Sequence, residues 1–325
     1  MSAVLAARLV TALLAAGLVT AMLAGCADDS ETPLPAGNLR VATGLDGGVY
    51  RVYGRALAGI LDRDLRPMRV TAVQTEGSIE NLQLLDTHRA DIAFSLADAA
   101  LLAVAGKSRF SRPVKVAALA RLYDDYLQII VRKEDSKLRH IADLAGKTVS
   151  IGAKGSGTAV VARRILRLPT VGLRGRAPVR MRSLTLKAST GALIAGDIDA
   201  FFWSGGLPSE AIVDLQDKVD IRLLGLPEGT AKELDSELYT EAPIPEDIYG
   251  KEGAVNTVIA SNLLVVRQDL PTEVAYRITR ALFEHKRELV KQHPQATRLN
   301  LGSATRTYPL EPHPGARRWY REARR

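Results

Sequence analysis

Cysteine is almost absent from this chain, which has only Cys26 among 325 residues. A disulfide within the chain needs two cysteines, so the fold must be stabilised by packing alone. The length permits this, because it exceeds that of one typical domain and allows a sizeable buried core.

The signatures of common enzyme sites are missing as well. The loop at 152–158 has no lysine after Gly157, as a P-loop would, and Val160 stands where a dinucleotide fingerprint has its third glycine. No Gly-x-Ser-x-Gly elbow occurs, and the five histidines include no His-Glu-x-x-His pair. The sequence therefore predicts no enzymatic activity, no cofactor and no metal site. Asp124-Asp125 is interpreted as a polar turn before a strand.

The N-terminus has the pattern of an export signal. Arg8 precedes an apolar run at 9–23 that is too short to span a bilayer comfortably, and small residues precede Cys26. The stretch Leu-Ala-Gly-Cys at 23–26 resembles the lipobox of bacterial lipoproteins. We expect residues 1–25 to be a signal peptide, Cys26 to be lipidated, and 26–37 to be a flexible tether at the outer face of the cell membrane. An uncleaved anchor with a buried thiol is the alternative, and the polar segment at 27–33 argues against it.

The formal net charge is +8, and removing 1–25 takes away one cation, Arg8, and no anion, which leaves +7. Outside the membrane such a chain meets lipid headgroups and wall polymers. The arginine clusters at 174–182 and 317–325 are therefore expected to be solvated faces, with membrane attraction as a second possibility and no nucleic-acid partner.

Strand and helix patterns alternate along the rest of the chain, which is typical of an α/β fold with mostly parallel sheets. We predict strands at 39–43, 70–74, 92–94, 126–131, 147–152, 199–203 and 262–267. Helices are predicted at 49–61, 78–87, 98–105, 141–146, 155–168, 190–195 and 271–291. The segments 88–94 and 195–201 echo each other, each with an acidic residue before an apolar strand. This indicates two similar lobes, 38–124 plus 267–325 and 125–266, joined by extended segments.

Five phrases of the sequence carry a family resemblance, at 43–50, 77–81, 91–98, 152–158 and 199–202. In this order they resemble the TAXI family, the solute-binding proteins associated with tripartite ATP-independent periplasmic (TRAP) transporters. The tail at 308–310 and 313–316 is similar too, so the resemblance runs from about residue 39 to the C-terminus. It implies a monomeric, two-lobed periplasmic-binding-protein fold of type II-like form, closing a hinged cleft over an amino acid or carboxylate.

Glycine and hydroxyl residues open three of the predicted helices, at 47–48, 77–78 and 155–158. The free N–H groups and positive dipole end of such a helix can receive a carboxylate. Simple N-capping by Ser156 or Thr158 is the common alternative for one such site. Three openings on different strands can converge on one cleft.

The chain departs from the family pattern at Leu45-Asp46 and at Leu96-Ala97, where the family usually has glycine and threonine, and Gln-Ser. Leu96-Ala97 removes the two polar donors of Gln-Ser, and Asp46 adds a carboxylate. If Asp46 and Asp98 face the cleft, they favour an ammonium group, so we hypothesise an α-amino acid or similar zwitterion. An N-cap role for Asp46 is the alternative.

The predicted ligand-binding residues are Thr43, Gly44, Asp46, Tyr50, Ser78, Asn81, Asp98, Ser156, Gly157, Thr158 and Trp203. Tyr50 and Trp203 are expected to form an apolar or stacking wall. The membrane partner is expected to be a TRAP permease or, alternatively, a sensor kinase to which the closed receptor presents its ligand state. An extracytoplasmic hydrolase or wall-binding protein on the same scaffold is a further alternative, because fold does not fix function.

Overall fold

The computed structural model describes residues 33–249 and 253–324. The segment Leu34–Arg325 forms one compact unit. The predicted signal peptide, the lipidation site Cys26 and most of the tether lie outside the described residues. In the described ranges, no helix is both long and apolar enough to cross a bilayer.

The N-terminal part of the fold is a parallel β-α-β arrangement in which one strand, β1, lies between two others. β1 pairs in parallel with β2 on one side and with β3 on the other. The elements are β1 (Asn38–Ala42), α2 (Val49–Asp64), β2 (Arg69–Val73), α3 (Ser78–Asp86), β3 (Ile92–Leu96) and α4 (Ala97–Val104). All six were predicted from the sequence. Their apolar residues recur with the period of the element, as Leu57 and Leu61 on the buried face of α2 show.

A second set of elements repeats this arrangement, with β5 between β6 and β7 in parallel. It consists of η1 (Ile141–Leu144), β5 (Thr148–Ser150), α5 (Gly157–Ile165), η2 (Pro169–Val171), β6 (Arg180–Arg182), α6 (Leu186–Ala195), β7 (Ala200–Gly205), α7 (Glu210–Gln216), β8 (Ile221–Leu223), α8 (Thr230–Asp235) and β9 (Tyr239–Ile244). α6 begins four residues before its predicted start, because Thr185 caps it by accepting a hydrogen bond from the Ala188 N–H.

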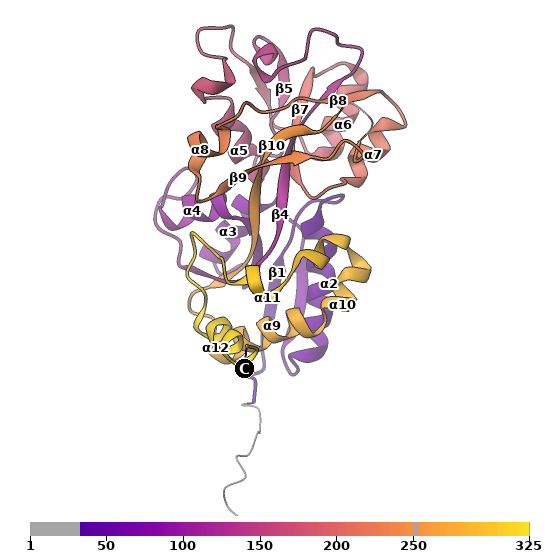
Figure 1. Ribbon diagram of the computed structural model, residues 1–325. Helices are drawn as coiled ribbons and strands as arrows, with labels where there is room; N and C mark the ends of the chain where they lie inside the picture. The colour runs from indigo at the N-terminus through magenta and orange to yellow at the C-terminus, as the bar shows by residue number, and fades with distance from the viewer. Residues whose placement is uncertain (1–32, 250–252, 325) are drawn as a thin grey trace, which may run out of the picture. The chain divides into compact units, whose positions relative to one another are not determined.

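Two long strands, β4 (Val116–Arg132) and β10 (Val255–Arg267), pair antiparallel and connect the two sets (Figure 1). The sheet order is β2-β1-β3-β10-β4-β7-β5-β6, with β8 on β4 and β9 on β10. Both strands start earlier than predicted, β4 by ten residues and β10 by seven. The early part of β4 includes Arg121, Asp124 and Asp125, which hide the strand pattern, whereas pairing with β10 supplies its backbone partners.

The chain ends in helices that return to the first set of elements: α9 (Thr272–Glu284), α10 (Lys286–Gln292), η3 (Pro294–Arg298), α11 (Leu301–Ala304) and α12 (Pro314–Glu322). The single helix predicted at 271–291 is wrong, because the chain leaves helical geometry at His285. There the His285 Nε2 atom lies 2.7 Å from a carboxylate oxygen of Asp64 on α2. We use lobe I for β1–β3, α2–α4 and α9–α12, and lobe II for the elements from η1 to β9.

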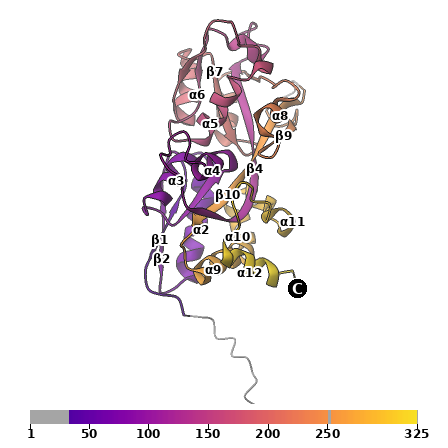
Figure 2. The ribbon, with the colours of Figure 1, turned by 90° about the vertical axis from the view of Figure 1, so that its left-hand side faces the viewer.

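Helices lie on both faces of the sheet (Figures 1 and 2). Three apolar clusters hold them there. One lies under α3 and α4 of lobe I and continues under α5 and α8 of lobe II. The second packs α2, α9 and α12 on the opposite face of lobe I, and the third packs α6 and α7 on lobe II. The first cluster therefore joins the two lobes in this conformation.

The two echoed phrases occupy matching places in the two lobes. Asp91 precedes β3 and accepts a hydrogen bond from the Arg40 N–H of β1, at 2.8 Å. Asp199 precedes β7 and accepts one from the Thr148 N–H of β5, at 2.7 Å. Each aspartate therefore satisfies a backbone donor of the neighbouring parallel strand, which explains why the acidic residue recurs.

Candidate functional site

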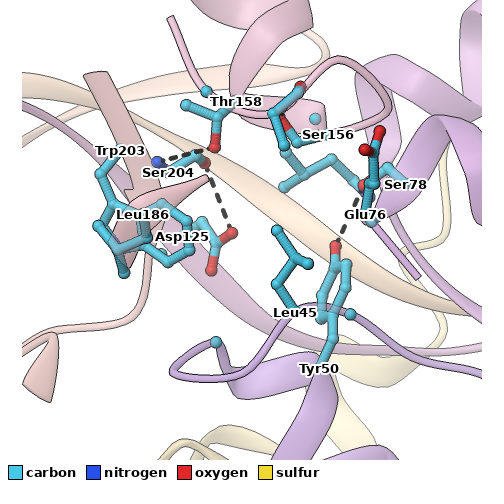
Figure 3. Close-up of a pocket in the computed structure, with 18 of the residues that line it drawn as sticks. Leu45, Tyr50, Glu76, Ser78, Asp125, Ser156, Thr158, Leu186, Trp203 and Ser204 are labelled. Carbon is cyan, nitrogen blue, oxygen red and sulfur yellow. Dashed lines mark hydrogen bonds between the residues drawn. The ribbon is translucent and has the colours of Figure 1, made fainter. Parts of the chain in front are cut away.

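A cavity of about 70 Å³ lies between the two lobes (Figure 3). Its walls come from the N-terminal ends of α2, α3, α5 and α6, from the middle of β4 and from the end of β7. The carboxyl ends of β1, β2, β3, β5 and β7 all point toward it. This is the place where open α/β sheets bind ligands.

Seven of the eleven predicted ligand-binding residues line the cavity: Gly44, Tyr50, Ser78, Ser156, Gly157, Thr158 and Trp203. They come from four separate segments of the chain, so the fold brings together residues that are up to 159 positions apart.

Thr43 and Asn81 lie behind the cavity wall and hold strands together. The Thr43 hydroxyl donates to the Val73 carbonyl at 2.7 Å. The Asn81 amide donates to the carbonyls of Thr43 and Phe94, at 2.7 and 2.8 Å. Both side chains are fully buried. Their hydrogen bonds tie the ends of β1, β2 and β3 together, so the structure gives them a supporting position and not a lining one.

The two carboxylates predicted to receive an ammonium group also lie outside the cavity lining. Asp98 is buried on α4, where it accepts a hydrogen bond from the Tyr239 hydroxyl of β9 at 2.5 Å. Asp46 is 79% exposed on the turn before α2 and forms an ion pair with Arg51 at 3.2 Å. The prediction that these two side chains face the cleft is therefore wrong. Asp98 contacts Tyr239 and Asp46 contacts Arg51, and neither lines the cavity.

On the lobe I side, the Tyr50 side chain forms the wall. Its hydroxyl donates to the Asn262 side-chain oxygen on β10 and lies 3.5 Å from the Ser78 hydroxyl (Figure 3). Ser78 in turn accepts a hydrogen bond from the Leu96 N–H at 3.1 Å. Burial raises the pKa of Tyr50 well above its ordinary value, so this wall presents a neutral phenol.

On the lobe II side, the cavity meets the N-terminus of α5. The Ser156 hydroxyl caps this helix, accepting from the Ala159 N–H at 3.2 Å and donating to the Ala153 carbonyl at 2.8 Å. The N-cap alternative is thus confirmed for Ser156. The Thr158 hydroxyl accepts from the Ser204 N–H at 3.2 Å (Figure 3). The first backbone N–H groups of α5 are therefore the donors available to a ligand at this side of the cavity.

The two lobes touch beside the cavity through the loop before α5. The Gly155 carbonyl accepts hydrogen bonds from the Ile79 and Glu80 N–H groups, at 3.1 and 3.4 Å. The Gly155 N–H donates to the Glu76 carboxylate at 2.8 Å. The N-terminus of α3, one of the three predicted anion-receiving openings, is therefore occupied by the chain's own carbonyl in this closed conformation.

Asp125 is the most informative lining residue that the sequence analysis missed. It lies in the middle of β4 with 6% exposure, so the predicted polar turn at this position is wrong. Burial raises the pKa of Asp125 to about 7, against the opposing effect of the Asn262 amide nearby. Two adjacent aspartates inside an apolar run were the available signal, but only pairing with β10 turns one of them inward.

The other missed lining residues give the cavity its apolar and hydroxyl character: Leu45, Val49, Tyr123, Leu184, Leu186, Ser189, Phe202 and Ser204. Glu76 and Asp125 are the carboxylates of the lining, and none of the described lining residues is lysine, arginine or histidine. Across the part of the chain that the structure describes, no group of three or more His, Cys, Asp or Glu side chains is placed to hold a metal ion.

A model of the NMT1-like family matches residues 41–323, which is most of the chain. Solved structures give a more distant likeness. The binding-protein component of an ABC phosphonate transporter from Pseudomonas aeruginosa is 14% identical, with a TM-score of 0.53, over 81% of this chain and 79% of that one. XAC2383 from Xanthomonas citri, bound to ATP, is 14% identical with a TM-score of 0.51, over 88% of this chain and 94% of that one. At this identity, the likeness shows the α/β fold of binding proteins.

Proposed function

This chain belongs to the NMT1-like family, and we propose that it is an extracytoplasmic solute-binding protein that captures a small amino acid or carboxylate between two lobes. The observation that carries this proposal is the closed cavity, whose walls come from both lobes and contain convergent polar groups within an apolar lining. We propose binding without catalysis. The described lining contains no histidine, cysteine or lysine, and the sequence has none of the enzyme motifs considered above.

We propose that residues 38–124 plus 267–325 and residues 125–266 move as two bodies. β4 and β10 both pass from one lobe to the other and supply the hinge. A ligand that contacts both walls binds the closed form more tightly than the open form, and so shifts the population toward closure.

The size of the cavity limits the ligand. Its volume of about 70 Å³ is several times the ~10–15 Å³ that one water molecule requires. At this degree of closure the site accommodates a small solute, and larger amino acids require the lobes to open slightly. The amide groups at the α5 N-terminus favour a carboxylate at that end of the ligand.

A thermal-shift screen of the full-length chain tests the proposal. The twenty amino acids and a set of small carboxylates are added one at a time. A cognate solute at 100 times its Kd should stabilise the protein by about 2.7 kcal/mol. It should also change the fluorescence of Trp203, which lines the cavity. If no solute of either class raises the melting temperature, the proposed ligand class is wrong.

We further propose a lipid anchor at Cys26 and a TRAP permease as the membrane partner, on the strength of the phrases at 43–50, 77–81 and 152–158. A sensor kinase is the alternative partner. The Pseudomonas aeruginosa neighbour belongs to an ABC transporter, but at 14% identity it shares the fold and leaves the partner open. A gene for a large permease beside this one would favour transport, and a sensor-kinase gene would favour signalling.

A further inference from the structure

One carboxylate oxygen of Asp125 lacks a hydrogen-bond partner although it is buried at the cavity. The Oδ2 atom accepts a long hydrogen bond of 3.4 Å from the Ser204 hydroxyl (Figure 3). The Oδ1 atom has no partner within hydrogen-bond distance, and the nearby Asn262 side-chain amide, which lowers the pKa of Asp125, is also without a partner. Burying an ionised oxygen without a donor is unfavourable, and such atoms are rare in folded proteins. The position therefore fits a ligand that brings a donor of its own.

Among the residues that the structure describes, none of the charged groups that influence this carboxylate is positive. The described lining has no cationic residue. Arg121, on the same strand, instead forms a bidentate ion pair with Asp124, at 2.7 and 2.8 Å. The charged neighbours that influence Asp125 are Asp124 and Asp98, and both are acidic. With Glu76 also in the lining, the carboxylates of the cavity face no cationic side chain, which favours a cation over a dianion.

Two hydrogen-bond donors of the same lining are also without acceptors. These are the Tyr123 hydroxyl, on the strand that carries Asp125, and the Trp203 indole N–H of β7. The cavity thus combines an unsatisfied anionic acceptor with two unsatisfied neutral donors. A solute with a cationic donor group and an oxygen acceptor would satisfy all three atoms.

We propose that Asp125 binds the ammonium group of a zwitterionic solute, while Trp203, Tyr123 and the first amide groups of α5 donate to its carboxylate oxygens. This inference rests on the proposed function and assigns its ligand a charge pattern. The ammonium site is thus assigned to Asp125 instead of Asp46 and Asp98. Those two carboxylates have partners outside the cavity, whereas the Oδ1 atom of Asp125 lies at the cavity without one. A solute without the ammonium group leaves Asp125 unpaired and binds more weakly.

Calorimetry on the full-length chain at pH 8 tests the assignment with matched pairs of solutes. The pairs are glycine and acetate, L-alanine and propionate, and L-glutamate and glutarate. We expect at least one amino acid to bind, and to bind tenfold or more tightly than its partner. Asp125→Asn should weaken that amino acid at least thirtyfold and bring the members of the pair within threefold of each other.

Asp124→Asn is the matched control, because it removes the adjacent carboxylate, which pairs with Arg121 and does not line the cavity. It should keep the preference for the amino acid. A second measurement covers the case in which Asp125→Asn does not fold. In the unmodified protein, the affinity for the amino acid should fall as the pH drops from 8 to 5, as Asp125 gains its proton, while the affinity for its partner does not fall.

Three results overturn the assignment. Equal or tighter binding of the deaminated solutes would exclude the ammonium site and leave the proposed function intact. An undiminished preference in Asp125→Asn would place the ammonium elsewhere. If no member of any pair binds and the thermal-shift screen also finds no ligand, the proposed function fails and the assignment fails with it.

Discussion

At the scale of single residues, the buried carboxylate of Asp125 suits the binding of a cationic ligand group but lowers the stability of the ligand-free protein. Burial raises the pKa of its carboxyl to about 7, and its ionised form lacks a donor for Oδ1. Binding sites often contain groups whose pKa is shifted in this way, because they bury charged groups that recognise a ligand. The ligand-free protein should therefore be less stable when Asp125 is ionised.

The pH dependence of stability follows from the direction of this shift. A carboxyl with a pKa of about 7 when folded and about 4 when unfolded holds its proton more tightly in the folded state. Ligand-free protein should therefore lose stability as the pH rises from about 4 to 7, with no further loss from this group above that range. Asp125→Asn removes the effect. It should be more stable than the unmodified protein at pH 8 by roughly 2–4 kcal/mol, and nearly equal to it at pH 4.

Urea unfolding of both proteins across this pH range measures the difference in their free energies of unfolding. Taking this difference cancels the pH effects of groups that the two proteins share. Asp124→Asn serves again as the control. It removes only one of the charges that raise the pKa of Asp125 and leaves the buried carboxyl in place, so its difference should be smaller than that of Asp125→Asn. A difference for Asp125→Asn that does not grow between pH 4 and 8 would contradict the proposed cost of the ionised carboxylate.

At the scale of elements, the N-terminus of α5 decides how closely the lobes approach. Gly157, the first residue of this helix, faces Leu96 and Ser78 of lobe I. A Cβ atom at Gly157 would lie 2.4 Å from the Leu96 Cδ1 atom and 2.9 Å from the Ser78 hydroxyl oxygen. Both neighbours are buried, and Ser78 is held by the Leu96 N–H. There is thus no room for a side chain at position 157 unless Leu96 or Ser78 moves.

Gly157→Ala should push the two lobes apart. We expect a loss of about 1–3 kcal/mol in the free energy of unfolding, as for other overpacking substitutions, together with at least tenfold weaker binding of the cognate solute. Urea unfolding and calorimetry measure the two effects.

Gly191→Ala is the matched control within α6, where a Cβ atom would meet nothing within 4 Å. Because alanine restricts the unfolded chain, this variant should gain about 0.4–1 kcal/mol and keep its affinity. If both substitutions have the same effect, the contact of Gly157 with lobe I is not what limits closure.

At the scale of the whole molecule, apolar packing and polar contacts together hold the closed form. One apolar cluster continues from α3 and α4 to α5 and α8. Around it lie the bonds of Gly155 to α3 and the bond between Asp98 and Tyr239. Arg164 supports this last contact, with its guanidinium 5.3 Å from the centre of the Tyr239 ring. Opening the lobes must break all of these, so a ligand has to compete with contacts that already favour closure.

The proposed attachment to the membrane is a second property at this scale, and it rests on the sequence pattern around Cys26. Cys26→Ser should abolish lipidation and release the protein from the membrane fraction into the soluble fraction, because the polar tether has no other apolar anchor once the signal is cleaved. Fractionation with an immunoblot measures this. Retention of the variant in the membrane to the same extent as the unmodified protein would show that Cys26 is not the anchor.

The sequence by itself determined the local elements and the outline of the site. Hydrophobic period, glycine at the helix openings and the echo of 88–94 in 195–201 are local patterns, and they predicted β1 to β3 and α2 to α4. The seven lining residues were predicted from the helix openings together with the family resemblance. These patterns are visible in the sequence because each helix or strand must bury one face and satisfy the backbone groups at its own ends.

Only the tertiary structure decided which carboxylate faces the cavity. Asp46, Asp98 and Asp125 all lie near cleft segments in the sequence, and nothing local distinguishes them. Asp46 pairs with Arg51 and Asp98 with Tyr239, whereas Asp125 is turned inward because β4 pairs with β10, more than a hundred residues later. The direction of a side chain in a strand depends on register with a distant partner, and that register is a property of the folded chain.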